Sequence, residues 1–390
     1  MAAFVPLMFA WLPVGFPPNL AQAEKEVSAN IGVEELKAHV YRLASPDFAG
    51  RKGPGGLRAA KHIAGQFKAM GLKPAFGPSY FQTIPDYLTD PTGKKNFLGR
   101  NVGAVIPGSD PKLKDEWIVV TGHFDHLGKR GNVMYPGADD NATSVAMVLE
   151  VAEKISKMKT PPKRTIYFVS FDLEEVGLLG SRYFAVHPPM PIEKLKTFIT
   201  ADMLGRSMGN VMDEYMFALG WETSPELHKL IITLPTPKGL KVGRLGSDIV
   251  GTRSDYGPFR DRDIPFLFFT TGQNPDYHTP RDLPDRIDYH KLQKICDWIT
   301  DLTLRLANDE HSPTWTDNRI QDLDEVNTIR ILCQRLLKEP DAINLSKGQQ
   351  RFIGGMESRL ATILDRGRMS AGDRTWLVWT SRYLLVSVFR

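Results

Sequence analysis

Cysteine and net charge are both scarce in this sequence. Cys296 and Cys333 are the only cysteines among 390 residues, so the chain has neither a disulfide framework nor a C-x-x-C metal site. The sequence is compatible with one disulfide bridge between the two cysteines and equally with two separately buried thiols. The 49 basic and 45 acidic side chains leave a net charge of +4 and form no dense basic stripe. We therefore expect no nucleic-acid partner, because a protein that follows a phosphate backbone needs such a stripe.

Long hydrophobic runs are also lacking, even at the apolar N-terminus. The first 23 residues have no charged side chain, and they end in Ala-Gln-Ala before Glu24. This pattern is typical of a secretory signal peptide over residues 1–23, with a disordered or buried N-terminus as the alternative. Four prolines keep the run below the ~20 apolar residues that a membrane-spanning helix needs. We therefore expect a secreted or periplasmic protein without a stable membrane anchor.

The rest of the chain predicts one large domain, 24–310, and a smaller extension. Its 42% hydrophobic and 24% charged residues suit a globular chain of this length. Short apolar strands alternate with amphipathic helices, which indicates an α/β fold with a mainly parallel mixed sheet flanked by helices. The predicted strands cover 101–106, 117–121, 165–171, 198–201, 215–219 and 265–269.

Helical spacing of apolar residues covers much of the remaining sequence. In the main domain it is found at 33–43, 60–70, 142–158 and 285–306, and Gly71 is placed to end the second of these helices. Residues 311–390 begin with a polar linker and continue with apolar residues at helical spacing. They predict a small C-terminal helical extension. The oligomeric state is left open.

Five residues with metal-binding side chains follow strand-like runs. Sites in mainly parallel sheets form beyond the carboxyl ends of the strands, where these residues would gather. Two imidazoles and three carboxylates, one of them shared, suffice for two metal ions and leave room for water, as in catalytic zinc sites. Such mixed ligands also accept cobalt or manganese. The predicted ligands are His123, Asp140, Glu175, Asp202 and His278.

Each of these segments alone has an ordinary structural explanation. A histidine that ends a strand is more often structural, the acidic pair at 139–140 could cap a helix, and the glutamates at 174–175 could form a solvated turn. The metal hypothesis depends on one event repeating five times. In WIVVTGHFDHLG, strand alternation also puts His123 and Asp125 on one side, so the carboxylate can orient the imidazole. Neighbouring glutamates can likewise divide ligand and proton-transfer roles.

Five stretches contain the candidate ligands between residues 122 and 285: GHFDHLG, GADDNATS, FDLEEVGLLGSRYF, ADMLGR and DYHTPRDLPD. In their order and spacing they resemble the motifs of the co-catalytic zinc aminopeptidases of metallopeptidase family 28. The loop SPDFAGRKGPGG and the helix after it are also similar to the family.

The resemblance implies two zinc ions and a peptide substrate. One ion is expected at His123 and Asp202 and the other at Glu175 and His278, with Asp140 between them. The resemblance also assigns three further roles. Glu174 is the expected general base and acid, Tyr277 the expected stabiliser of the oxyanion, and Asp125 the expected support of His123. The implied activity is the release of N-terminal amino acids.

Three other functions are weighed against this one. The same fold includes carboxypeptidases, although the sequence shows no arginine cluster for a carboxylate pocket and no inserted domain directly before His123. It also includes glutaminyl cyclases, which use one zinc ion, and binding proteins that have lost their metals. The complete ligand set disfavours the last two. Residues 253–256 could line a substrate pocket or form an ordinary turn.

Overall fold

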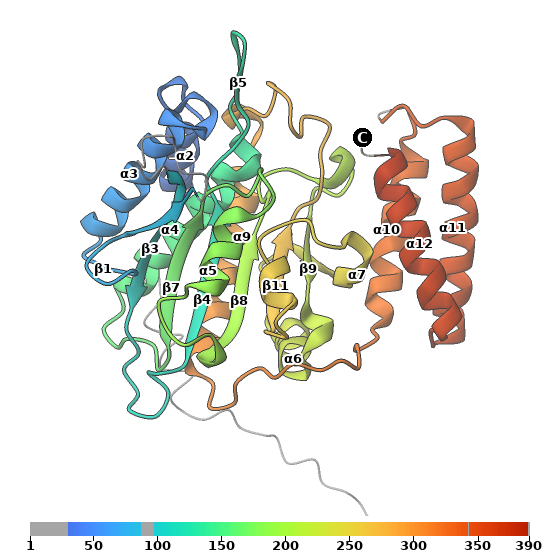
Figure 1. Ribbon diagram of the computed structural model, residues 1–390. Helices are drawn as coiled ribbons and strands as arrows, with labels where there is room; N and C mark the ends of the chain where they lie inside the picture. Colours follow the sequence, from blue (N-terminus) through green and yellow to red (C-terminus); the bar gives the residue numbers. More distant parts are fainter. Residues whose placement is uncertain (1–29, 87–96, 342, 389–390) are drawn as a thin grey trace, which may run out of the picture.

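The computed structural model describes residues 30–86, 97–341 and 343–388 (Figure 1). The predicted signal peptide lies outside the described residues. The helices are α2 (Val33–Leu43), α3 (Pro54–Ala69), α4 (Thr143–Ser156), α5 (Leu179–Val186), α6 (Pro225–Thr233), α7 (Ser247–Val250), α8 (Gly257–Arg260), α9 (Tyr289–Asn308), α10 (Leu323–Lys338), α11 (Lys347–Arg366) and α12 (Ala371–Val388). The strands are β1 (Lys73–Pro74), β2 (Phe81–Pro85), β3 (Phe97–Ile106), β4 (Trp117–His123), β5 (Gly128–Arg130), β6 (Val133–Tyr135), β7 (Thr165–Phe171), β8 (Leu195–Ala201), β9 (Tyr215–Leu219), β10 (Lys241–Arg244) and β11 (Phe266–Thr270).

Nine strands form one mixed sheet in the order β1-β3-β7-β4-β8-β11-β9-β10, with β2 beside β3. The four central strands β7, β4, β8 and β11 are parallel to one another. Strands β3 and β9 run antiparallel to β7 and β11 on either side. The carboxyl ends of the four central strands therefore meet at one edge of the sheet, where sites form in such folds. The short hairpin of β5 and β6 lies outside this sheet.

Alternate residues of the central strands point to opposite faces, and each face has its own core. In β4, Ile118 and Val120 join the core that includes α2, α3, α4 and α9. The intervening residues Trp117 and Val119 join a second core with α5 and the C-terminal helices. Every residue of β4 and of β7 is buried, as expected of strands covered on both sides. The predicted α/β fold with helices on both faces is confirmed.

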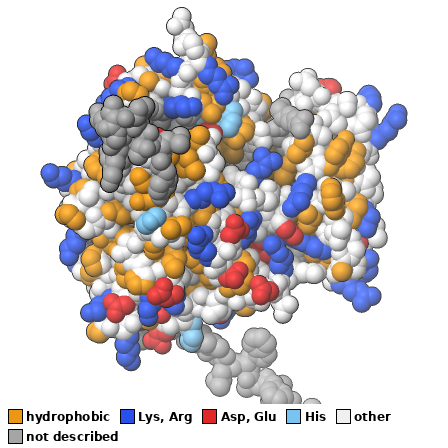
Figure 2. All heavy atoms as spheres, viewed as in Figure 1, with side chains coloured by type: hydrophobic (Ala, Val, Ile, Leu, Met, Phe, Trp, Pro, Cys, Tyr) orange, Lys and Arg blue, Asp and Glu red, His pale blue; other side chains and the backbone are white. Residues whose placement is uncertain are grey.

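The C-terminal extension consists of three long helices beside the β9 end of the sheet (Figure 1). Ile329 of α10 lies in the same core as Phe217 of β9. Arg374 of α12 forms ion pairs with Glu325 of α10 and Asp248 of α7. The extension is therefore attached to the sheet by both apolar and charged contacts. On the face shown in Figure 2, basic and acidic side chains are interspersed, in keeping with the small net charge.

The predicted elements agree with the structure except at their ends. Each predicted strand overlaps an observed one. The helix predicted over 285–306 begins later, at Tyr289, because the Asp288 side chain accepts a hydrogen bond from the N–H of Lys291 and caps it. Gly71 follows α3 with a φ of +73°, as predicted. Both cysteines are free and buried, so the pair forms no bridge within the described residues. Among the described helices, none is long and apolar enough to cross a membrane.

Candidate metal centre

The five predicted ligands come from separate segments and meet at the carboxyl edge of the sheet. His123 is the last residue of β4, and Asp202 directly follows β8. Asp140 lies in the short helical turn before α4, Glu175 in the turn after β7, and His278 in the loop after β11. The side chain of His278 is 35% exposed, whereas those of the other four are at most 10% exposed. The cluster is therefore most open to solvent on the His278 side.

Asp140 presents one carboxylate oxygen to each of two groups of side chains. Its Oδ1 lies 3.4 Å from Nε2 of His123, which is also 3.4 Å from Oδ1 of Asp202. Its Oδ2 lies 3.0 Å from Nε2 of His278, which is 3.2 Å from Oε2 of Glu175. Ligand atoms around a tetrahedral zinc ion lie about 3.3 Å apart, given metal bonds of about 2.0–2.1 Å. The observed separations suit such an ion.

Several polar atoms in this cluster are buried without a hydrogen-bond partner in the described part of the chain. They include Nε2 of His123 and Oδ1 of Asp202. Buried polar atoms are normally satisfied, and a bound cation would satisfy these. The side chains therefore fit a metal centre. Candidate ligand atoms lie within 4.8 Å of one another in each of two groups, His123 with Glu174 and Asp202, and His126 with Asp140 and Glu175.

Burial and close contact shift the pKa values of these groups. Burial raises the pKa of Asp202, and it raises the pKa of Glu174 to about 10. Burial alone would lower the pKa of His278, but hydrogen bonds to Asp140 and Glu175 raise it to about 10. The metal-free cluster therefore holds protons that compete with a metal for the same atoms. Metal binding here should release protons.

The adjacent glutamates lie on a turn that the side chain of Asp125 holds in place. Its two carboxylate oxygens accept hydrogen bonds from the N–H groups of Glu174 and Glu175, at 3.0 and 3.3 Å. Oε2 of Glu174 lies 3.9 Å from Nε2 of His123, at the edge of the first group. Nδ1 of His123 is 3.2 Å from the backbone oxygen of Asp125 and 3.6 Å from its carboxylate. Asp125 therefore contacts His123 and also fixes the glutamate turn.

Tyr277 lies against the most exposed ligand. Its ring stacks on that of His278, with 3.8 Å between the centroids. Burial, followed by the charges of Asp140 and Asp202, raises the pKa of Tyr277 far above its ordinary value. Its hydroxyl group therefore stays protonated and can donate a hydrogen bond.

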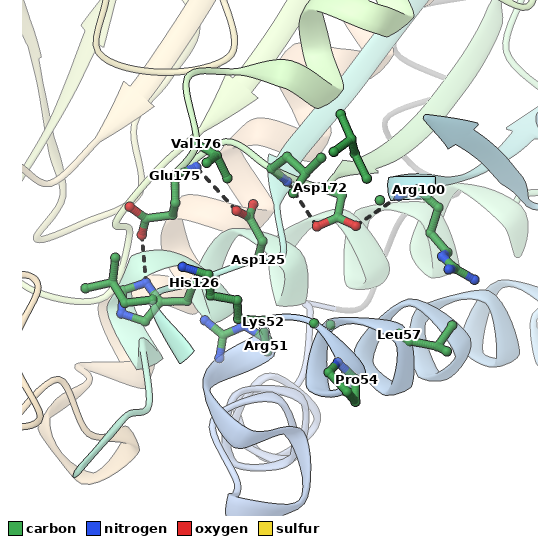
Figure 3. Close-up of a pocket in the computed structure, with 16 residues that line it drawn as sticks. Arg51, Lys52, Pro54, Leu57, Arg100, Asp125, His126, Asp172, Glu175 and Val176 are labelled. Carbon is green, nitrogen blue, oxygen red and sulfur yellow. Dashed lines mark hydrogen bonds and ion pairs between the residues drawn. The ribbon is translucent and has the colours of Figure 1, made fainter. Parts of the chain in front are cut away.

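The structure adds His126, which the sequence analysis did not select. Its Nδ1 lies 2.8 Å from Oε1 of Glu175 (Figure 3). The same atom lies 3.7 Å from Oδ2 of Asp140. The sequence did contain a signal, because His126 is the second histidine of GHFDHLG. That position was not recognised because continued alternation would place His126 on the side opposite His123, whereas β4 ends at His123 and the chain after it no longer alternates.

The segment 253–256 divides between the centre and the core. Ser254 and Asp255 are buried, and burial raises the pKa of Asp255 to about 7. Tyr256 is fully buried and stacks on Phe266 of β11, with centroids 4.9 Å apart. Tyr256 is therefore a core residue rather than part of a substrate pocket.

A cavity of about 360 Å³ adjoins the centre (Figure 3). Asp125, His126 and Glu175 form the wall nearest the ligands. Arg100 of β3 and Leu57 of α3 contribute to the rest of the lining. The cavity offers both a charged and an apolar surface beside the cluster, so it has room for part of a substrate.

A family model, Peptidase family M28, matches residues 101–303, which is more than half of the chain. The chain belongs to peptidase family M28. The matched stretch contains all five predicted ligands, from His123 to His278, and it ends before the C-terminal helices.

Curated relatives of this M28 chain match only part of their own length. The aminopeptidase YwaD of Bacillus subtilis is 27% identical over 235 residues, which cover 56% of this chain and 48% of that protein. The chain spans about half the length of the curated relatives it matches.

Solved structures show the same fold for this M28 chain. The LapA aminopeptidase of Legionella pneumophila has a TM-score of 0.58 at 22% identity, over 78% of this chain and 79% of that one. The glutaminyl cyclase of Bacteroides thetaiotaomicron has a TM-score of 0.54 at 18% identity, over 70% of this chain and 98% of that one. At these identities the likeness concerns the fold alone.

Proposed function

We propose that the protein is a zinc-dependent aminopeptidase that releases N-terminal amino acids from peptides. The position of Asp140 between two groups of ligands carries this proposal, since a carboxylate with one oxygen toward each group can serve two metal ions of a hydrolytic site. Membership of peptidase family M28 and the name of the Bacillus subtilis relative support the reaction class.

In this proposal two zinc ions share one carboxylate. His123 and Asp202 would hold the first ion, Glu175 and His278 would hold the second, and Asp140 would be shared between them. Zinc, when bound, supplies Lewis acidity, which lowers the pKa of water towards ~7 and polarises a peptide carbonyl group. The chain's own residues must then orient the peptide and move the protons.

Glu174 is the proposed general base and acid. Its carboxylate borders the first ligand group, 3.9 Å from Nε2 of His123, and it is 12% exposed, so a water molecule can reach it. In this role it would take a proton from water and give it to the leaving amine. Asp125 holds the backbone of Glu174 and so fixes the direction of its side chain.

Tyr277 is the proposed stabiliser of the oxyanion. It remains protonated and stacks on His278, so its hydroxyl group is a donor beside the second ligand group. A donor held in place before the reaction stabilises developing negative charge without a cost of reorganisation.

The alternatives remain a carboxypeptidase, a glutaminyl cyclase and a non-catalytic binding protein. The glutaminyl cyclase is retained as an alternative because the chain shares its fold with a solved glutaminyl cyclase. A cyclase would need one zinc ion, whereas the side chains form two groups around Asp140. The carboxypeptidase differs from the aminopeptidase only in which end of the peptide it recognises.

The proposed location is secreted or periplasmic, with residues 1–23 as the signal peptide. The apolar, uncharged sequence and its Ala-Gln-Ala end support this location. The proposed division is a peptidase domain over 24–310 and a helical extension over 311–390. Mass spectrometry of the protein exported from its host should show cleavage after Ala23.

The function is tested by metal analysis of the purified chain together with hydrolysis of a leucine anilide. About two zinc ions per chain and release of the anilide that a chelator abolishes are the expected results. One ion with cyclisation of an N-terminal glutamine would favour the cyclase instead. Hydrolysis of a blocked peptide from its C-terminus would favour the carboxypeptidase.

A further inference from the structure

Arg51 is buried beside the metal centre although it cannot ligate a metal. It is fully buried, and it lines the same cavity as His126 (Figure 3). All five N–H groups of its guanidinium group donate hydrogen bonds, and every acceptor is a backbone carbonyl oxygen. A buried arginine is usually paired with a carboxylate, so this set of acceptors calls for a physical reason.

The acceptors belong mainly to the two segments that carry ligands. Nε donates to the oxygen of Phe124, which follows His123, at 2.6 Å. Nη2 donates to the oxygens of Gly137 and Asp140, at 2.6 and 3.2 Å. Arg51 therefore joins the end of β4 to the turn that presents the shared carboxylate. The other acceptors are the oxygens of Leu43 and Pro136, at 3.0 and 2.6 Å.

The loop before α3 is built to bring Arg51 to this place. Arg51 has a φ of +51°, which side-chain-bearing residues rarely adopt. A Cβ atom on the preceding Gly50 would lie 2.5 Å from the oxygens of Gly128 and Tyr135. The loop is thus in direct contact with the hairpin of β5 and β6. An uncommon backbone conformation persists only where the surroundings hold it, and such positions gather at functional sites.

The charge of Arg51 also matters to the cluster. Burial lowers the pKa of Arg51 to about 10, while Asp140 and Asp282 act in the opposite direction. The guanidinium group is therefore still charged at neutral pH. It places a fixed positive charge among carboxylates that would otherwise repel one another before metal binds.

We propose that Arg51 is a positioning residue of the metal centre, which holds the backbone next to His123 and at Asp140 in the geometry that the metal requires. This inference rests on the proposed zinc function. Groups that orient metal ligands from the second layer typically change metal affinity 10- to 100-fold when they are replaced. Here one side chain orients the segments of a terminal and a shared ligand at once.

The test is the zinc affinity of Arg51→Lys, measured by competition with a chromophoric chelator. Lysine keeps the positive charge but cannot make five directed hydrogen bonds, so the change isolates the geometry. We expect the dissociation constant for zinc to rise about 10- to 100-fold. The thermal midpoint of the metal-free variant, measured in parallel, reports its general loss of stability.

Arg164→Lys is the matched control. Arg164 is also buried, and its Nη1 donates to the carbonyl oxygen of Leu306, but it directly precedes β7 at the opposite edge of the sheet. We expect Arg164→Lys to bind zinc with unchanged affinity, even if its metal-free thermal midpoint falls as much as that of Arg51→Lys. Equal weakening in the two variants would mean that stability alone is responsible, and the inference would be wrong.

The outcomes separate this inference from the proposed function. A wild-type chain that binds no zinc overturns the function, whereas wild-type affinity in Arg51→Lys overturns only the positioning role. If Arg51→Lys does not fold, Arg51→Ala is purified with guanidinium ion in the buffer, and zinc affinity is measured as that ion is removed. If zinc affinity falls as guanidinium is removed but does not respond to ammonium in the same way, the positioning role is supported. If zinc affinity stays constant as guanidinium is removed, the role is refuted.

Discussion

Zinc should stabilise the folded chain by an amount that reveals how many ions bind. His123 and His278 face different oxygens of Asp140 and belong to segments far apart in the chain. Their joint geometry exists only when the sheet is folded. An ion that binds the folded state alone adds RT ln(1 + [Zn]/Kd) to the free energy of unfolding. Well above Kd, this contribution grows by about 1.4 kcal/mol for each tenfold rise in free zinc, and by about 2.7 kcal/mol for two ions.

The assay is urea unfolding in a series of zinc buffers, with the fraction unfolded monitored by tryptophan fluorescence. The free energy of unfolding is plotted against the logarithm of free zinc. His278→Ala provides the control, because it removes a terminal ligand of one ion and should halve the slope. A wild-type slope of about 1.4 kcal/mol per decade, or none, would refute the two-ion reasoning.

Three further predictions concern single side chains. Glu174→Gln should keep the zinc content and lower kcat for a leucine anilide at least about 100-fold; loss of zinc together with activity would contradict its role as base. Tyr277→Phe should lower kcat about 100-fold with little change in KM, and a raised KM at unchanged kcat would make Tyr277 a substrate-binding residue instead. Burial, helped by His39 and Arg42, lowers the pKa of His62 from 6.5 to about 4. Its unfolded form therefore takes up a proton first, and stability is lost as pH falls from 6.5 to about 4. Because His62 is partly exposed, we expect this contribution to be about 1–2 kcal/mol and to be absent in His62→Phe, as measured by urea unfolding at both ends of that range.

Much of the fold could be predicted because the central strands have a strong signal. Strands β4 and β7 are buried throughout, so their sequences are largely apolar. The shorter strands β1 and β10 have two and four residues, which is too few for any periodic pattern. The antiparallel pairing of β9 with β11 was also beyond prediction, since a sequence pattern does not give strand direction.

The parts of the candidate site that consist of metal-binding side chains could be predicted from the sequence, whereas the contacts made by backbone atoms could not. Four of the five predicted ligands end or follow central strands, and Asp140 lies in the turn before α4; that edge of the sheet brings the five together. Arg51 could not be recognised in this way. Its acceptors are carbonyl oxygens, which every residue has, so only the folded arrangement of three distant segments reveals them.

The C-terminal helices have a consequence for self-association. Strand β10 pairs only with β9 among the described strands, and an open strand edge can recruit a strand from another molecule. The first turn of α10 covers this end of the sheet. Glu325 accepts the N–H of Gly246, just past β10, and Asp324 lies 3.5 Å from the backbone nitrogen of Arg244. The extension thus covers an open strand edge that could otherwise pair with a strand of another molecule.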